Sequence, residues 1–105
     1  MPKSKLDPLP SAAFHILLAL ADEDRHGYGI MREVAELTSG KMRLGPGTLY
    51  GSIKTLLDAG LIAELQSDDR RRYYRLTPAG RKLAKAETAR LVETVRIARA
   101  KKMYA

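Results

Sequence analysis

The sequence predicts a mostly α-helical domain with one small β-hairpin and a long helix at its C-terminal end. Three observations lead to this expectation. Three consecutive segments show helical apolar periodicity, two short alternating segments flank a polar turn, and an uninterrupted helical pattern fills the rest of the chain. With 105 residues the chain has room for one small domain. We divide it into a flexible lead-in (residues 1–10), a core domain (residues 11–76) and a C-terminal helix (residues 77–105).

The first helix is expected to begin at Ser11, whose hydroxyl suits the N-cap position after a lead-in with three prolines. An acidic run at residues 22–24 would end it. The apolar segment of this helix, residues 12–21, is interrupted by His15 and is too short to cross a membrane. With no signal peptide before it, the chain is expected to be cytoplasmic and to have no membrane partner.

A second helix is expected from Tyr28 to Thr38, because apolar residues recur there at spacings of three and four. These residues are Ile30, Met31, Val34 and Leu37. Tyr28 is expected to be a buried aromatic residue at the helix start, and His26 a loop residue. Gly40 suits the left-handed conformation that ends many helices. Residues 41–44 alternate and fit either a short strand or an extended connection.

The third helix, residues 45–59, has a small and weakly charged outward face. Pro46 fits its first turn, and Gly60 follows its end. With about 3.6 residues per turn, one face is a core stripe made of Leu49, Ile53, Leu56 and Leu57. The opposite face consists of Gly47, Gly51, Lys54 and Asp58, with Thr48, Tyr50 and Thr55 at its edges. Small side chains there would let the helix backbone come close to another surface.

A β-hairpin is expected next, with strands at residues 61–66 and 71–76 and polar turn residues at 67–70. Adjacent strand residues point to opposite faces, so Tyr73 and Tyr74 cannot both be buried. We expect Tyr73 to be the exposed one.

The last helix is expected to start at Thr77 as N-cap with Pro78 in the first helical position, and to run for about 25 residues. That length exceeds what a small domain needs to cover its own core. A stripe of apolar residues resembles a coiled-coil seam, and a domain of this size gains stability by dimerising. We therefore expect a homodimer whose interface includes Leu91, Val92, Val95 and Ala98.

The net charge of +7 is concentrated in one half of the chain. Residues 61–105 hold twelve Lys/Arg against five Asp/Glu, whereas residues 1–60 are balanced. Residues 70–85 contain seven basic residues and no acidic one. Such a cluster suits a polyanionic partner, because each neutralised phosphate releases counterions. A solvated basic surface is the alternative.

Three helices followed by a hairpin is the order of a winged helix-turn-helix, whose third helix enters the DNA major groove. We therefore expect double-stranded DNA as partner. The expected contacts are Gly47, Thr48, Tyr50, Gly51, Lys54 and Thr55 in the third helix and Arg70, Arg71 and Arg72 in the wing. Two points stay open: Tyr50 either contacts DNA or packs against a neighbouring element, and the arginines either contact phosphates or form a solvated tip.

Three segments resemble the PadR family of bacterial transcriptional regulators: HGYGI (residues 26–30), GPGTLYGSIKTLLDAGLI (residues 45–62) and RRRYYRLTPAGRKL (residues 70–83). The resemblance implies a homodimer joined through the C-terminal helix that binds a palindromic operator, with Thr48, Tyr50, Lys54 and Arg70–Arg72 as DNA contacts. Some small members bind flat drugs between tryptophans. This chain has no Trp, so such a pocket is not expected, and the identity of any effector is open.

Other classes of function find little support. The chain has no cysteine, so disulfides and cysteine zinc sites are excluded, and neither histidine has a plausible metal set around it. No nucleophile motif or phosphate-cradling loop is visible, which argues against an enzyme and gives no cofactor. We expect a DNA-binding repressor, with an RNA-binding module or a protein–protein adaptor as alternatives.

Overall fold

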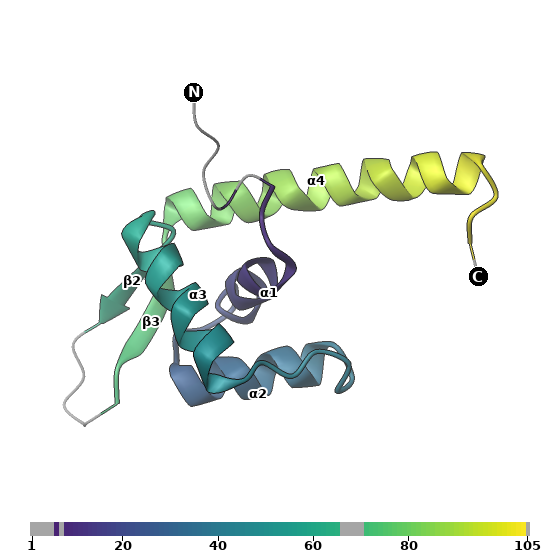
Figure 1. Cartoon of the computed structure of the whole chain (residues 1–105). Coiled ribbons are helices and arrows are strands. Elements are labelled where there is room, and N and C mark those ends of the chain that lie inside the picture. The colour runs from purple at the N-terminus through teal and green to yellow at the C-terminus, as the bar shows by residue number, and fades with distance from the viewer. Residues whose placement is uncertain (1–5, 7, 66–70, 105) are drawn as a thin grey trace.

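The computed structural model describes residue 6, residues 8–65 and residues 71–104 of the 105-residue chain. In chain order the elements are α1 (Ser11–Ala19), β1 (Arg25–His26), α2 (Gly27–Leu37), α3 (Pro46–Asp58), β2 (Ile62–Leu65), β3 (Tyr73–Leu76) and α4 (Pro78–Ala100) (Figure 1). This confirms the predicted fold class, a mostly α-helical winged helix-turn-helix followed by a long helix. The expected turn at residues 67–70 lies outside the described residues.

The sheet has three antiparallel strands in the order β1-β3-β2. β2 and β3 form the predicted hairpin, with Ile62 opposite Leu76 and Leu65 opposite Tyr73. β1 was not predicted, since two residues are too short to show alternation. It adds to the free edge of β3 and places His26 opposite Tyr73.

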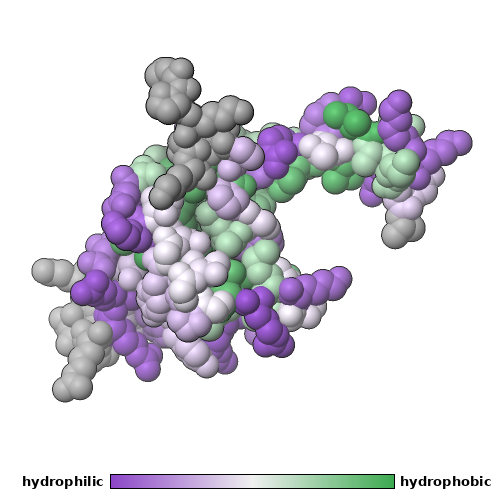
Figure 2. Space-filling model, in the orientation of Figure 1, coloured by the Kyte–Doolittle hydropathy of each residue, from purple (hydrophilic) through white to green (hydrophobic). Residues whose placement is uncertain are grey.

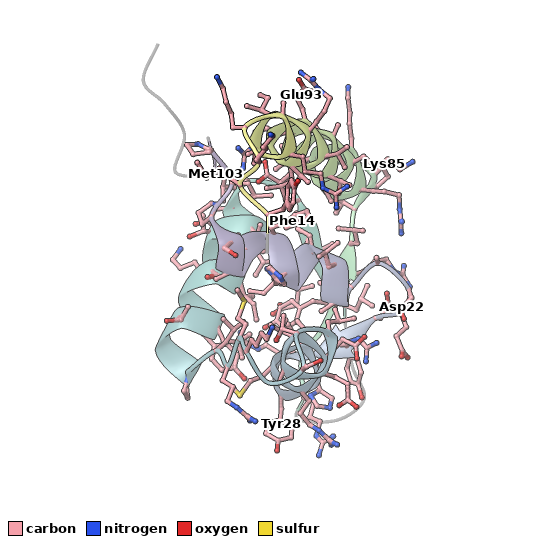
Figure 3. The ribbon with its side chains drawn as sticks, turned by 90° about the vertical axis from the view of Figure 1, so that its right-hand side faces the viewer. Phe14, Asp22, Tyr28, Lys85, Glu93 and Met103 are labelled. Carbon is pink, nitrogen blue, oxygen red and sulfur yellow. The ribbon has the colours of Figure 1, made fainter. Side chains whose placement is uncertain are left out.

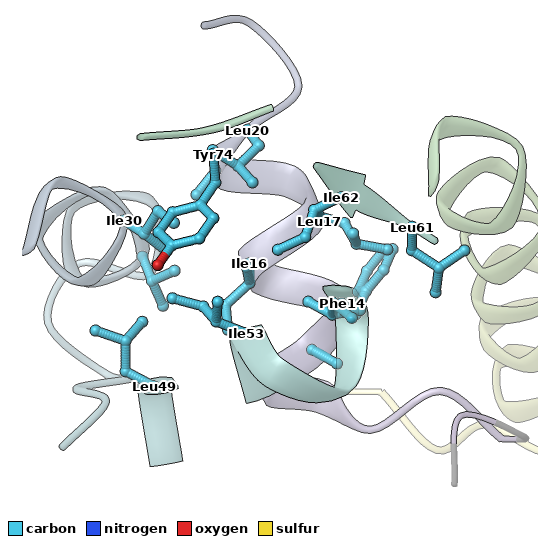
Figure 4. Close-up of a cluster of buried hydrophobic side chains, with 14 of the residues drawn as sticks. Phe14, Ile16, Leu17, Leu20, Ile30, Leu49, Ile53, Leu61, Ile62 and Tyr74 are labelled. Atoms are coloured by element: carbon cyan, nitrogen blue, oxygen red, sulfur yellow. The ribbon is translucent and has the colours of Figure 1, made fainter. Parts of the chain in front are cut away.

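The core lies between α1, α2, α3 and the inner face of the sheet (Figure 4). Its largest fully buried side chains are Ile16, Leu17, Ile30, Val34, Leu49 and Leu56. Tyr74 is buried, as one of the two tyrosines was predicted to be. Tyr73 was expected to be exposed but is half-buried, because the ring of His26 packs against it. Leu6 and Leu9, in the expected lead-in, also join the core. Leu37 was predicted on the apolar face of the second helix but is exposed, because it lies in the last turn of α2, beyond the part of that helix packed on the core.

The helix starts differ in how they are capped. The prediction that Ser11 caps α1 was wrong: Pro10 is the N-cap residue and no side chain caps this helix. Helical hydrogen bonding already begins at Pro10, whose carbonyl oxygen accepts from the Phe14 N–H at 2.9 Å. Thr77 caps α4 as predicted, with its Oγ1 accepting from the Gly80 N–H at 3.0 Å.

The connection between α2 and α3 is extended and forms no strand at residues 41–44. Gly40 adopts the predicted left-handed conformation, with a φ of 79°. α3 then begins at Pro46 with Gly45 as its N-cap residue. This connection leads from the end of α2 back to the start of α3, which lies beside the start of α2 (Figure 1).

α4 starts on the body of the domain and then extends past it (Figure 1). Its first turn lies close to the chain before β2, where a Cβ at Gly80 would collide with the carbonyl oxygen of Leu61. With 23 residues the helix is about 34 Å long. No helix in the described part of the chain is long and apolar enough to span a membrane.

A candidate nucleic-acid interface

The beginnings of α2, α3 and β3 meet at one end of the molecule, and α4 lies at the opposite end (Figure 1). α3 packs its core stripe against α1, so its other face points outward. The predicted DNA contacts in α3 and the described wing arginines therefore belong to elements that are neighbours in space.

The outward face of α3 is exposed to solvent and carries mostly small side chains. Gly47, Thr48, Gly51 and Lys54 are exposed, and Thr55 is half-buried. No atom lies within 4 Å of the place where a Cβ would stand on Gly47 or on Gly51. The two glycines therefore serve no packing purpose inside the domain and instead leave open space in front of the helix.

Lys54 is the only basic residue of α3. Its Nζ lies 3.1 Å from a carboxylate oxygen of Asp58, and both side chains are more than half exposed. An exposed pair of this type contributes little to stability and exchanges partners easily. The ammonium group of Lys54 is thus available to a phosphate.

Tyr50 packs against a neighbouring element, which is one of the two roles that the sequence left open, and it also stays partly exposed. Its ring packs against the start of α2, where a Cβ on Gly27 would stand 2.6 Å from the Tyr50 hydroxyl oxygen. At the same time 52% of the residue is exposed. Only a glycine at position 27 lets Tyr50 lie in this position.

The arginines near the wing differ in their partners. Arg75 is neutralised by Asp24 in a two-point contact of 2.9 and 3.2 Å. Arg72 lies 3.7 Å from Glu64, with both groups exposed. In the described part of the chain, Arg71 has no carboxylate within ion-pairing distance, and Arg70 lies outside the described residues. Arg71 instead lies with its Nη1 3.3 Å from the Nε2 of His26.

His26 links the sheet to α2. It ends β1 and caps α2, with Nδ1 accepting a hydrogen bond from the Gly29 N–H at 3.0 Å. Its ring stacks on Tyr28 at 6.4 Å between centroids and meets the ring of Tyr73 edge-on at 5.5 Å. Burial, and then the charge of Arg71, lower the pKa of the imidazole.

Two sequence predictions at this site were therefore wrong. His26 is not a loop residue but a strand residue and a helix cap. Tyr28 is not buried: it is 60% exposed, because the inward positions of the first turn of α2 are taken by Gly27 and Ile30. Figure 3 shows Tyr28 at the end of the molecule opposite α4. The first glycine of the segment HGYGI, Gly27, is visible in the sequence. The reason for it is not, because the Tyr50 side chain that requires a glycine there belongs to α3.

These residues enclose a pocket of about 350 Å³ between α2, α3 and the hairpin. It is lined by His26, Gly27, Tyr28, Tyr50, Arg71, Arg72 and Tyr74. No group of three side chains suited to a metal ion occurs among the described residues.

A second surface feature is apolar and lies on α4. Val92 and Val95 are at least half exposed, Leu91 is 37% exposed, and Ala98 is half-buried. Leu91, Val92 and Val95 border a groove of about 480 Å³ between α4 and α1. The groove is lined by Phe14, Leu18, Thr88, Leu91, Val92, Val95 and Arg99. Phe14 lies on the side of α1 that faces α4 (Figure 3), and hydrophobic residues continue along the part of α4 that extends past the body (Figure 2).

Comparison with known proteins gives a consistent result. Residues 16–86 match the family model described as the transcriptional regulator PadR-like family. The transcriptional regulator Rv3488 of Mycobacterium tuberculosis is 39% identical over 85 residues, which cover 78% of this chain and 77% of that protein. An uncharacterised transposon protein of Streptomyces fradiae is 46% identical over 72 residues, which cover 69% of this chain and only 20% of that protein.

Solved structures agree with this fold. A transcriptional regulator from Clostridium thermocellum superposes with a TM-score of 0.77 at 28% identity, covering 84% of this chain and 89% of its own. Bacillus subtilis PadR, solved in complex with operator DNA, has a TM-score of 0.63 at 22% identity, covering 72% of this chain and 45% of its own.

Proposed function

This chain belongs to the PadR-like family of transcriptional regulators, and on that premise we propose that it is a homodimeric repressor that binds a palindromic operator through α3 and the hairpin. Members of the family are transcriptional regulators and not enzymes. The observation that carries the proposal is the outward face of α3, which is exposed, small and free of packing contacts at Gly47 and Gly51. We assign DNA binding to residues 11–76, dimerisation to residues 77–105 and the site of action to the cytoplasm.

In the proposed complex α3 lies in the major groove. The glycines bring its backbone close to the bases, and Thr48, Tyr50, Lys54 and Thr55 donate hydrogen bonds to base edges or phosphates. Arg70, Arg71 and Arg72 contact the sugar–phosphate backbone and supply affinity that does not depend on sequence. The operator complex of Bacillus subtilis PadR supports double-stranded DNA as the partner class.

The exposed apolar side chains of α4 support the homodimer. A monomer would leave Leu91, Val92 and Val95 in water along a helix that extends past its own domain, and contiguous exposure of this kind marks an interaction surface. We propose that α4 of a second copy buries these side chains, because in a two-fold dimer the same apolar stripe of both helices forms the interface. Binding to a palindromic operator requires such a dimer to place its two α3 helices about 34–36 Å apart, which is one turn of B-DNA. We propose that such a dimer represses the promoter that it occupies.

One observation favours a second candidate function. Tyr28 and Tyr50 are both more than half exposed at the pocket, and single-stranded RNA binds by stacking its bases on aromatic side chains. The structure does not favour a protein–protein adaptor that docks through α3, because the outward face of α3 carries small and polar residues and no apolar patch.

The decisive experiment maps the genomic sites bound by the protein in its own cells and measures its affinity for the recovered sequences as duplex DNA and as single-stranded RNA. We expect inverted repeats whose half-sites lie about 10 bp apart from centre to centre, and tighter binding to the duplex. Absence of enriched DNA sites, or tighter binding to the RNA, would overturn the proposal.

A further inference from the structure

We propose that the pocket between α2, α3 and the hairpin is a subsite for a single phosphate, in which His26 and Arg71 donate hydrogen bonds to the same anion. The inference deepens the proposed function and rests on it, because the phosphate that we assign to the pocket is a backbone phosphodiester of duplex DNA. It adds His26, which the sequence analysis placed in a loop, to the residues that contact DNA.

The hydrogen bond from Gly29 locates the proton of His26. Its Nδ1 accepts a hydrogen bond from the backbone N–H of Gly29 at 3.0 Å, so Nδ1 carries no proton. A neutral imidazole has one N–H, which must then be on Nε2. Burial, and then the charge of Arg71, lower the pKa of His26 and so favour the neutral ring. The Nε2 atom is therefore a hydrogen-bond donor.

The neighbour of Nε2 is a second hydrogen-bond donor. The Nη1 of Arg71 lies 3.3 Å away, and a guanidinium is also only a donor. Two donors cannot satisfy each other, so this contact lacks an acceptor. Among the described residues no carboxylate supplies one to either atom. An anionic oxygen placed between them would accept from both, and such charge-assisted bonds are the strong ones.

The imidazole of His26 is held in place before the anion arrives. The imidazole is fixed by its bond to Gly29, by stacking on Tyr28 and by the edge contact with Tyr73. The Tyr50 hydroxyl lies over Gly27 in the same pocket and adds a further donor. Little side-chain freedom remains to be lost on binding.

The location of the pocket identifies the source of the phosphate. It lies between α3 and the hairpin, the two elements that we assign to DNA. A helix in the major groove is flanked by the backbone, so a donor cluster beside α3 meets a phosphodiester. The cluster would thus fix the depth and register of α3 and carry no base preference.

Two substitutions of His26 separate its capping role from its donor role. His26→Asn places a side-chain oxygen near the Nδ1 position and keeps a good N-cap, but it has no group at the Nε2 position. His26→Gln reaches the Nε2 position with an amide N–H but lacks the cap acceptor. Arg71→Ala is the charge control. Each variant is tested as the full chain against a mixed-sequence duplex, because phosphate contacts are independent of sequence.

We expect His26→Asn to melt at the same temperature as the parent protein and to bind the duplex about tenfold more weakly, as for one lost hydrogen bond to a charged group. Its salt dependence should be unchanged, because a neutral donor releases no counterion. Arg71→Ala should weaken binding and also reduce the slope of log K against log salt by about 1 per protomer. His26→Gln should melt lower and bind more tightly than His26→Asn.

The inference is overturned if His26→Asn binds as tightly as the parent. It is also overturned if His26→Gln binds more weakly than His26→Asn, because affinity would then depend on the helix cap and not on the donor at the Nε2 position. Nitrogen-15 NMR of the imidazole gives a test that does not depend on these variants. We expect the Nε2–H tautomer in the free protein and a shift of Nε2 with the duplex. A proton on Nδ1, or an unmoved Nε2 signal, also overturns it.

Inorganic phosphate distinguishes the sources of the anion. A shift of Nε2 with the duplex but not with inorganic phosphate assigns the pocket to backbone phosphodiesters, and a shift with both shows that free phosphate also binds there. If the parent chain binds no DNA while inorganic phosphate shifts Nε2, the phosphate site stands and the proposed regulator function fails.

Discussion

Gly51 offers a test in which stability and function are expected to change in opposite directions. It lies in the middle of α3, on the outward face, and nothing in the domain stands within 4 Å of the position that its Cβ would occupy. A larger side chain can therefore be added without a clash inside the protein. The same side chain would occupy the space through which, in our proposal, the helix backbone approaches DNA.

The expected gain in stability follows from helix propensity. Glycine in a helix interior is worse than alanine by about 0.5–1 kcal/mol, so Gly51→Ala should stabilise the domain by that amount. For a domain of about 60–100 residues, 1 kcal/mol corresponds to roughly 4–8 °C in melting temperature. Gly51→Leu should retain most of the gain, because leucine is also a good helix former.

The expected loss in binding comes from a larger distance between the α3 backbone and the DNA bases. A leucine at position 51 holds the α3 backbone away from the base edges, so Gly51→Leu should weaken operator binding at least tenfold, or about 1.4 kcal/mol, and Gly51→Ala less. Thermal unfolding and fluorescence anisotropy on one preparation measure both quantities. Gly80→Ala is the control for the stability change. This glycine-to-alanine substitution should destabilise the domain, because the new Cβ would collide with the Leu61 carbonyl oxygen. Unchanged or tighter DNA binding by the stabilised Gly51→Leu variant would refute a close approach of α3 to DNA.

Three further predictions concern the wing, the dimer and a helix cap. Replacing both Arg71 and Arg72 by Ala should weaken binding about equally on all DNA sequences and reduce the salt slope by about 1–2 per protomer, measured by anisotropy across salt concentrations. Replacing Leu91 and Val95 together by Asp should give folded monomers in sedimentation experiments, because both side chains are at least one-third exposed in the single chain. Thr77→Ala should lower the stability of the domain by about 1 kcal/mol in chemical denaturation, because its Oγ1 caps α4.

Each of these has a matched control. Lys101→Ala removes one charge at the exposed far end of α4 and should leave the salt slope unchanged; an equal drop there would contradict the wing assignment. Ala86→Asp adds a charge to α4 on the side opposite the apolar stripe and should leave the dimer intact, whereas a surviving dimer in the Leu91 and Val95 variant would exclude α4 as its interface. Ser11→Ala should barely change stability, because Ser11 caps nothing.

Much of this protein was predictable from the sequence because its signals are local. The core stripe and the outward face of α3 follow from helical periodicity alone, and both occur as predicted at Leu49, Ile53 and Gly51. The start of α4 at Thr77 and Pro78 was predictable for the same reason, since a cap and its first turn involve only neighbouring residues. The division of Tyr73 and Tyr74 between the two faces of a strand is also a local property.

What the sequence alone determined is therefore the order of the four helices and of the β2–β3 hairpin, the inward face of α3 and the concentration of positive charge after residue 60. Only the tertiary structure decided that His26 pairs with Tyr73 across the sheet, that Tyr50 lies over Gly27, and that Arg71 and His26 face each other as two donors. The physical reason is that periodicity and capping arise between residues a few positions apart, whereas these contacts join segments more than twenty residues apart and form only when the whole core has packed.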